Sequence, residues 1–240
     1  GLGTEAVSLS LHGHGPVENW RGRLEFRMGE GNLLRADLTA GTKDEWKLGM
    51  EGILEVNPGF MPVPLAAWVG RETRFSGTGR LGKRETLFVD RFSMETGDLT
   101  LELSGSANLR DTNLTGRFRL LCRDLKPLGG LLYTRTGGTL RAEGDLRGTL
   151  AAPGAAITFS SRDLEVEPVR LSEFGGETLL DLSGPGDGKG PGLRLRGKGE
   201  AQGFSLRGLG AFPEKTLRWE LVAEIPFEGV IRVRDLEVSG

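Results

Sequence analysis

Hydrophobic and polar residues alternate with a period of two along much of the chain, most regularly over residues 140–150. In this stretch leucine, alanine and glycine occupy the even-numbered positions, and charged residues or threonine occupy the odd-numbered ones. Successive side chains of a strand point to opposite faces of a sheet. The pattern therefore predicts a half-buried strand with one apolar face and one charged face.

The same alternation restarts many times along the chain, for example at Val7, Leu24, Trp46, Leu99 and Trp219. Stretches that could form amphipathic helices are nearly absent. The sequence therefore predicts an all-β fold, an elongated and curled antiparallel or mixed sheet with a trough-like section, solenoidal growth and one or two short helical turns. The candidate lining of its apolar side is Trp46, Leu48, Met50, Leu99, Leu101, Leu103, Phe118, Leu120, Leu140, Leu146, Leu150, Ile157, Phe159, Leu193, Leu195, Trp219, Leu221, Ile225 and Phe227.

Glycine is unusually common in these strands. The chain contains 39 glycines in 240 residues, well above the average usage of about 7%. Many of them fall on the apolar parity, by which we mean the alternate positions of a strand that carry its apolar residues. A missing side chain at such a position permits a bulge, a bend or a close approach of other groups. We therefore expect a bent or closely approached sheet and not a flat one.

Two segments interrupt the alternation, at residues 62–69 and 126–132, and each has proline near its start. Proline is tolerated in the first turn of a helix, so both segments are predicted to form short helical turns. We expect residues 1–240 to be a single elongated β segment of a larger protein, with degenerate repeats at about 50–125 and 126–182. The glycine- and proline-rich stretch 184–192 is predicted to be a flexible loop.

Charge and composition exclude several classes of protein. The chain has 31 basic and 33 acidic residues, interleaved along the predicted strands, so it lacks the basic stripe of a nucleic-acid-binding surface. The longest apolar run, residues 60–69, contains two prolines and is about half the length of a membrane-spanning helix. The single cysteine, Cys122, falls on the apolar parity and is expected to be a small core residue.

Residues that carry chemistry are sparse. His12 and His14 would share one face of a strand, but neither a cysteine nor a carboxylate cluster completes a metal site near them. The carboxylates are accompanied by arginine or lysine on the charged parity, as a solvated face requires. We therefore expect no catalytic residues, no metal and no cofactor, and we predict that the protein is not an enzyme.

The passage from Arg123 to Val166 has an internal order of motifs. It begins with Arg123-Asp124-Leu125-Lys126-Pro127-Leu128-Gly129-Gly130, continues with Gly138-Thr139-Leu140 to Gly148-Thr149-Leu150 and Pro153, and closes with a further strand from Ile157. The Asp-Leu dipeptide recurs through the chain, with aspartates at 37, 98, 124, 145, 163, 181 and 235. Aspartate at a strand boundary can cap a turn, so these pairs are predicted to mark the ends of strands.

This passage resembles the repeats of the TamB and AsmA-like family of diderm bacteria (translocation and assembly module proteins). The resemblance covers roughly 45 residues of motif, with composition and alternation agreeing elsewhere. It implies an interior periplasmic segment of a protein anchored in the inner membrane, with an apolar groove that conducts phospholipid acyl chains between the inner and outer membranes. An outer-membrane β-barrel partner would be contacted through other parts of that protein.

Two other functions remain open. A free strand edge could template client strands in outer-membrane protein assembly. The chain could also be an extracellular β-solenoid or adhesin passenger with a sealed core, although the short coil period and the Asn, Ser or Thr ladders of such solenoids are not visible. The readings differ in whether the apolar side of the sheet is accessible or covered by the protein's own atoms.

Overall fold

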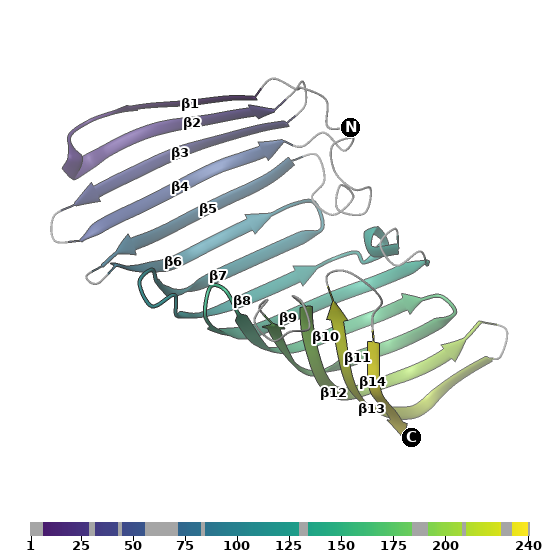
Figure 1. Cartoon of the computed structure of the whole chain (residues 1–240). Coiled ribbons are helices and arrows are strands. Elements are labelled where there is room, and N and C mark those ends of the chain that lie inside the picture. The colour runs from purple at the N-terminus through teal and green to yellow at the C-terminus, as the bar shows by residue number, and fades with distance from the viewer. Residues whose placement is uncertain are drawn as a thin grey trace. The chain divides into compact units, whose positions relative to one another are not determined.

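The computed structural model is all-β, which confirms the predicted fold class (Figure 1). It describes residues 7–28, 32–42, 45–55, 72–82, 85–129, 134–183, 192–207, 210–226 and 232–239. Within these ranges the side chains of residues 32, 128, 183, 210–215, 225, 226, 232–234 and 236 are not described. The chain divides into two compact units, Gly1–Arg110 and Asp111–Gly240. This division falls inside the first repeat that the sequence suggested.

The first unit contains seven described strands and one short 3₁₀ helix, η1. Strand order in space follows strand order in the sequence, and each strand pairs with its sequence neighbours. The elements are β1 (Val7–His14), η1 (Val17–Asn19), β2 (Trp20–Met28), β3 (Asn32–Thr42), β4 (Trp46–Glu55), β5 (Glu72–Leu81), β6 (Thr86–Glu95) and β7 (Leu99–Asn108).

The second unit repeats this arrangement, and its strands β9 to β13 are longer than those of the first unit and bend along their length in Figure 1. Its elements are β8 (Leu114–Cys122), η4 (Lys126–Leu128), β9 (Thr136–Gly148), β10 (Pro153–Val166), β11 (Val169–Ser183), β12 (Gly192–Leu206), β13 (Gly210–Pro226) and β14 (Arg232–Ser239). Every strand pairing described in either unit is antiparallel, an arrangement that allows neighbouring strands to be joined by a short turn, as β10 and β11 are through Glu167 and Pro168.

The short helical turns of the sequence prediction are partly confirmed. Residues 126–128 form the 3₁₀ helix η4, with Pro127 in its first turn. The other predicted turn, at residues 62–69, lies outside the described residues, as does the predicted loop except for Gly192, which begins β12. No helix in the described ranges is long and apolar enough to cross a membrane.

The Asp-Leu dipeptides do not all mark strand boundaries. Asp124 follows β8, and its Oδ1 accepts a hydrogen bond from the backbone N–H of Lys126 at 2.9 Å, which caps the turn into η4. Asp37 and Asp145 instead lie inside β3 and β9, where they form cross-strand ion pairs. The prediction was wrong for them because a charged residue on the solvent face of a strand has the same local sequence as a residue that ends one.

A line of irregularities crosses the strands of the second unit and changes which parity is apolar. In β10 an extra residue lies between Arg162 and Glu165, and Asp163 has φ 52°. In β12 Gly203 has φ 62° near another shift of register. In β10 the apolar residues before the bulge are odd-numbered, as Phe159 is. After the bulge they are even-numbered, as Leu164 is, and Leu164 pairs with Leu171 of β11. The bulges bend the strands while keeping apolar pairs opposite one another.

Few large apolar side chains are fully enclosed in either unit. The buried apolar residues are mostly alanines, and Cys122, with 1% of its surface exposed, is the largest side chain described as fully buried. The Cys122 thiol donates a hydrogen bond to the carbonyl oxygen of Asp124 at 3.1 Å. Beside it, Leu125 and Thr136 are buried, and the Thr136 hydroxyl donates to the carbonyl oxygen of Leu125. The prediction that Cys122 is a small core residue is confirmed.

Candidate functional site

The first unit has one apolar face, built from the same parity of each strand. Leu9 lies opposite Phe26, and Phe26 lies opposite Leu34. Across β3, β4 and β5 the register places Leu38, Met50 and Gly77 in one row. Because directly paired residues point to the same side of a sheet, the predicted residues of this unit share one face: Trp46, Leu48, Met50, Leu99, Leu101 and Leu103.

This apolar face is accessible to solvent over much of the described part of the first unit. Leu9 exposes 68% of its surface, and Leu48, on an interior strand, exposes 41%. Leu11, Trp46 and Met50 are exposed as well. Large apolar side chains in a row on one face of a sheet are normally covered by another layer. Their exposure is the main unusual feature of this unit.

The second unit also gathers its predicted residues on one face. Phe118 lies opposite Gly144, which lies opposite Ile157, and Leu195 lies opposite Ala223. By register the following share this face: Phe118, Leu120, Leu140, Leu146, Ile157, Phe159, Leu193, Leu195, Trp219, Leu221 and Ile225. The side chain of Ile225 and all of Phe227 lie outside the described set.

Leu150 does not belong to this face as a strand residue. Strand β9 ends at Gly148, whose φ of +102° breaks the alternation. Leu150 follows in a turn, is 51% exposed, and donates its backbone N–H to the carbonyl oxygen of Thr112 at 2.8 Å. The sequence analysis extended the strand too far because the alternation of apolar and polar residues continues past Gly148, although the backbone turns there.

Aromatic residues lie over glycines on both apolar faces. A Cβ built on Gly144 would lie 3.0 Å from Cε1 of Phe118, and one on Gly77 would lie 3.4 Å from Cδ2 of Phe92. Trp20 occupies the space beside Gly13 and Gly22. The glycines on the apolar parity thus leave room for neighbouring rings, which covers the exposed backbone of a glycine in a sheet.

Three of these rings form a cluster in the second unit. The ring centroids of Phe159 and Phe174 are 5.4 Å apart, those of Phe174 and Trp219 are 5.4 Å apart, and those of Phe159 and Trp219 are 6.0 Å apart. The pairs are tilted, an arrangement that aromatic quadrupoles favour. The indole Nε1 of Trp219 is buried and has no hydrogen-bond partner among the described atoms. The cluster therefore makes this part of the face strongly apolar.

Sequence reasoning left several residues of the two faces out of the candidate lining. Phe75 and Phe174 alternate with glycines, so their stretches lack the run of large apolar residues that identified other strands. Phe92 follows a bulge between Val89 and Phe92 that shifts the parity. A search for aromatic residues two positions from glycine would have found Phe75 and Phe174, whereas the bulge is visible only in the register.

The opposite face of each sheet is charged and carries cross-strand ion pairs. Arg23 Nε lies 2.9 Å from Oδ1 of Asp37, and Arg117 Nε lies 3.1 Å from Oδ1 of Asp145. The hydrogen bond to Asp37 raises the pKa of Arg23, and Asp90 raises the pKa of Arg80 in the same way. Both Arg117 and Asp145 are exposed, so their pair is expected to contribute little to stability.

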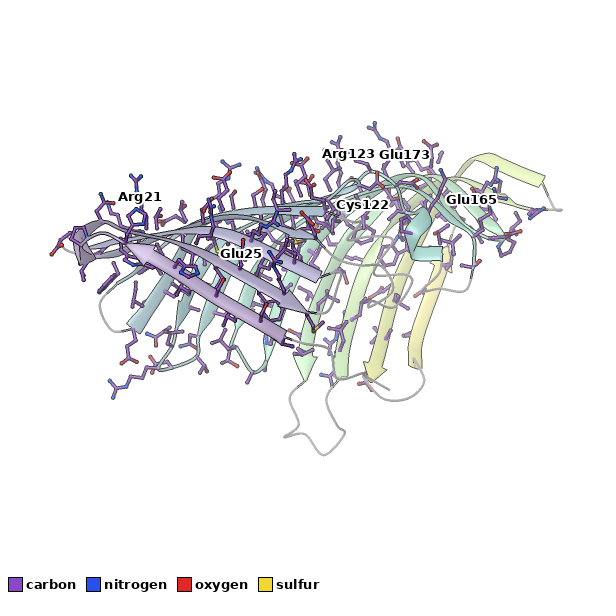
Figure 2. The ribbon with its side chains drawn as sticks, turned by 90° about the horizontal axis from the view of Figure 1, so that it is seen from above. Arg21, Glu25, Cys122, Arg123, Glu165 and Glu173 are labelled. Atoms are coloured by element: carbon purple, nitrogen blue, oxygen red, sulfur yellow. The ribbon has the colours of Figure 1, made fainter. Side chains whose placement is uncertain are left out.

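A depression of about 860 Å³ lies on the second unit and is open to solvent. Most side chains around it come from the charged parity of β10–β14, including Glu177, Lys198 and Arg218. Figure 2 shows the side chains of Arg123 and Glu173 standing outward from the sheet of this unit. The lining of the depression mixes both signs of charge, and Phe174 and Trp219 of the aromatic cluster also border it.

Candidate chemical groups are not gathered into a reactive site in the described residues. His12 and His14 lie on the charged parity of β1, opposite Arg23 and Arg21 of β2. The ranges that the structure covers contain no group of three or more His, Cys, Asp or Glu residues arranged to hold a metal ion. What these residues offer chemically is a large area for apolar contact, backed by a solvated charged face.

Comparison with known proteins adds no relative to this description. No protein-family model, no curated protein and no solved structure matches the chain.

Proposed function

We propose that the apolar faces of this protein conduct phospholipid acyl chains, as part of a periplasmic bridge between the inner and outer membranes of a diderm bacterium. The observation that carries this proposal is the exposure of large apolar side chains from interior strands, above all Leu48 and Met50 of β4. A soluble protein rarely exposes a contiguous apolar area of this kind unless something binds there. The resemblance of residues 123–166 to the TamB and AsmA-like repeats supports lipid as the occupant.

The energetic requirement for such a protein is large. Transfer of an acyl chain from lipid into water costs about 0.8 kcal/mol per methylene, or roughly 12 kcal/mol for a chain of about 16 carbons. An apolar surface that remains in contact with the chain lowers this barrier at each step. A row such as Leu9, Phe26 and Leu34, repeated across neighbouring strands, offers contacts of this kind.

The chemistry of the faces suits movement better than capture of one ligand. Specific ligand sites combine apolar walls with a few polar groups that fix orientation. The same side of the first unit instead presents mainly leucine, methionine, alanine, aromatic rings and glycine, and Thr73, which lies opposite Leu54, is buried. Dispersion contacts with such side chains are individually weak and similar from place to place. An acyl chain could therefore shift along the face without losing a strong interaction at any one position.

Photo-crosslinking tests this proposal. A photoreactive amino acid would replace Leu9 or Leu48, and matched controls would carry it at Ser8 or Lys47, which neighbour these residues in sequence but lie on the charged parity. After incubation with phosphatidylethanolamine and phosphatidylglycerol vesicles, mass spectrometry should find lipid adducts at Leu9 and Leu48 and several-fold fewer at the controls. Equal labelling of both faces, or none on the apolar face, would contradict lipid conduction.

A second function, templating of client strands for outer-membrane proteins, is supported by the edge strand β1. In the described part of the chain β1 pairs with β2 alone, so one side of its backbone has no partner there. Such an edge can accept an extended segment through main-chain hydrogen bonds. Leu9→Pro should remove this capture while lipid crosslinking at Leu48 persists. Loss of both activities together would favour a role of β1 in folding.

A sealed-core solenoid or adhesin is the least supported alternative. It requires the apolar side to be covered by the protein's own atoms. The exposure of Leu9 and Leu48 argues against such covering in the described part of the first unit.

A further inference from the structure

The exposed apolar side chains of interior strand β4 include a methionine. Strand β4 lies between β3 and β5 (Figure 1), and its residues Trp46, Leu48 and Met50 belong to the apolar face of the first unit. All three are exposed, and Met50 exposes 40% of its surface. Because β4 is paired on both sides over these residues, their exposure does not arise from an unpaired edge. An exposed thioether therefore lies on the surface that the proposed function uses.

The other described methionines are less accessible than Met50. Met28, at the end of β2, and Met94, in β6, are both half-buried. Met94 also pairs with apolar residues on each side, which restrict access to its sulfur. Met61 lies outside the described residues. Oxidation of a side chain depends on how easily the oxidant reaches it, so Met50 should react first among the three described methionines.

The thioether of Met50 lies over Gly77 of β5. Met50 is opposite Leu38 on β3 and opposite Gly77 on β5, and Gly77 in turn is opposite Phe92 on β6. A Cβ built on Gly77 would lie 3.2 Å from Cγ and 3.5 Å from Sδ of Met50. The missing side chain of Gly77 therefore leaves space beside the sulfur for an added oxygen. The side chains of this row carry no N–H or O–H donor that could bind that oxygen.

We propose that peroxide oxidises Met50 and thereby weakens lipid contact on the apolar face of the first unit. A lone pair of Sδ attacks one oxygen of hydrogen peroxide, and an S–O bond forms as the O–O bond breaks. The proton on the transferred oxygen passes to the departing hydroxide, which leaves as water. The sulfur loses two electrons and the peroxide gains them. The product is methionine sulfoxide, a polar side chain that methionine sulfoxide reductases convert back to methionine.

The effect on lipid rests on the proposed function. The flexible, polarizable thioether of Met50 makes favourable dispersion contacts with apolar groups. The sulfoxide oxygen instead accepts hydrogen bonds from water, and an acyl chain lying on Met50 would remove that water. Burial of a polar group without a hydrogen-bond partner is unfavourable. The oxidised face should therefore hold acyl chains less well around β4, and reduction of the sulfoxide should restore the contact.

Peptide mapping by mass spectrometry tests the reactivity of Met50. The 240-residue chain would be treated with hydrogen peroxide for increasing times, and sulfoxide would be measured at each described methionine. In the folded chain Met50 should be oxidised at least about threefold faster than Met28 or Met94, and the three rates should converge in urea, where all are accessible. Equal rates in the folded chain, or faster oxidation of Met28 or Met94, would overturn the proposal.

Lipid crosslinking from position 48 tests the consequence. A photoreactive amino acid would replace Leu48 in the otherwise unsubstituted chain and in Met50→Leu, whose side chain is apolar and has no sulfur. With phosphatidylethanolamine and phosphatidylglycerol vesicles, peroxide treatment should lower lipid adducts at least about threefold in the first chain and leave those of Met50→Leu unchanged. A methionine sulfoxide reductase should restore the adducts. Circular dichroism before and after treatment would verify that the strands are retained.

The contrary results of this experiment have distinct meanings. Unchanged adducts after oxidation of Met50 would overturn this inference and leave the proposed function standing. Equal loss of adducts in Met50→Leu would also overturn the inference, because the effect would then come from another residue. Absence of adducts from the untreated chain would overturn the proposed function and, with it, the effect of Met50 on lipid contact.

Discussion

Trp219 occupies the space that a side chain on Gly176 would need. A Cβ built on Gly176 would lie 2.8 Å from Cζ2 of the Trp219 indole, closer than real Cβ atoms approach such a group. Gly199, which lies opposite both residues on the intervening strand, closes the row. The glycines of this face are therefore part of its packing, because they accommodate large rings lying across several strands.

Gly176→Ala should destabilise the second unit. The added methyl group would meet both the Trp219 ring and the carbonyl oxygen of Lys198. Overpacking of this kind typically lowers the free energy of unfolding by about 1–3 kcal/mol, measurable by urea denaturation monitored by tryptophan fluorescence. Gly97→Ala is the control, because a Cβ there would have no heavy atom within 4 Å. Equal effects of the two substitutions would show that Trp219 does not require an empty position 176.

The bend in the second unit should depend on Gly138 and not on the adjacent Gly137. Gly138 has φ +102°, and its Cβ would lie 2.5 Å from the carbonyl oxygen of Asp163. A Cβ on Gly137 would meet Glu165 at an ordinary 3.7 Å. We expect Gly138→Ala to lower the free energy of unfolding by more than about 1 kcal/mol, and Gly137→Ala to leave it unchanged or raise it by about 0.4–1 kcal/mol. A neutral Gly138→Ala would contradict the described bend.

Trp46 should report lipid at the apolar face of the first unit. It is exposed and lies on the same parity as Leu48 and Met50. Phospholipids brominated on the acyl chain should quench a component of the fluorescence that is lost in Trp46→Phe, because bromine quenches only on close contact. The control is Trp46→Phe with Lys47→Trp, which moves the indole to the charged face. If that variant is quenched as strongly as the unsubstituted chain, the lipid contact is not confined to the apolar face.

Cys122 should react slowly with thiol reagents while the protein is folded. Its side chain is 1% exposed, and its thiol donates to the Asp124 carbonyl oxygen. Buried structural thiols are inert because reagents reach them only after local opening. Modification by a disulfide reagent should be at least about 100-fold slower than in urea, or than at a cysteine placed at exposed Ser8 in a Cys122→Ala background. Rapid labelling of native Cys122 would mean that the turn at 124–128 opens readily.

The parity of side chains could be read from the sequence with good accuracy. Leu48, Leu101, Phe118 and Leu195 all lie on the apolar faces that their alternation predicted. This succeeded because the two-residue period of a strand is a local property of the backbone. It failed at Leu150, where Gly148 turns the chain. Such a change of backbone direction leaves the alternation of residue types intact.

Register and exposure depended on the tertiary structure. The bulge that brings Phe92 opposite Leu103 arises from the pairing of β6 with β7, and no single strand encodes it. The rings over Gly144 and Gly176 are likewise contacts between strands. The alternation by itself determined that the chain is all-β and that each strand has an apolar side. Only the tertiary structure decided that Leu9 and Leu48 stay exposed while Cys122 is enclosed, because burial depends on which segments pack against a face and a periodic pattern carries no information about its neighbours.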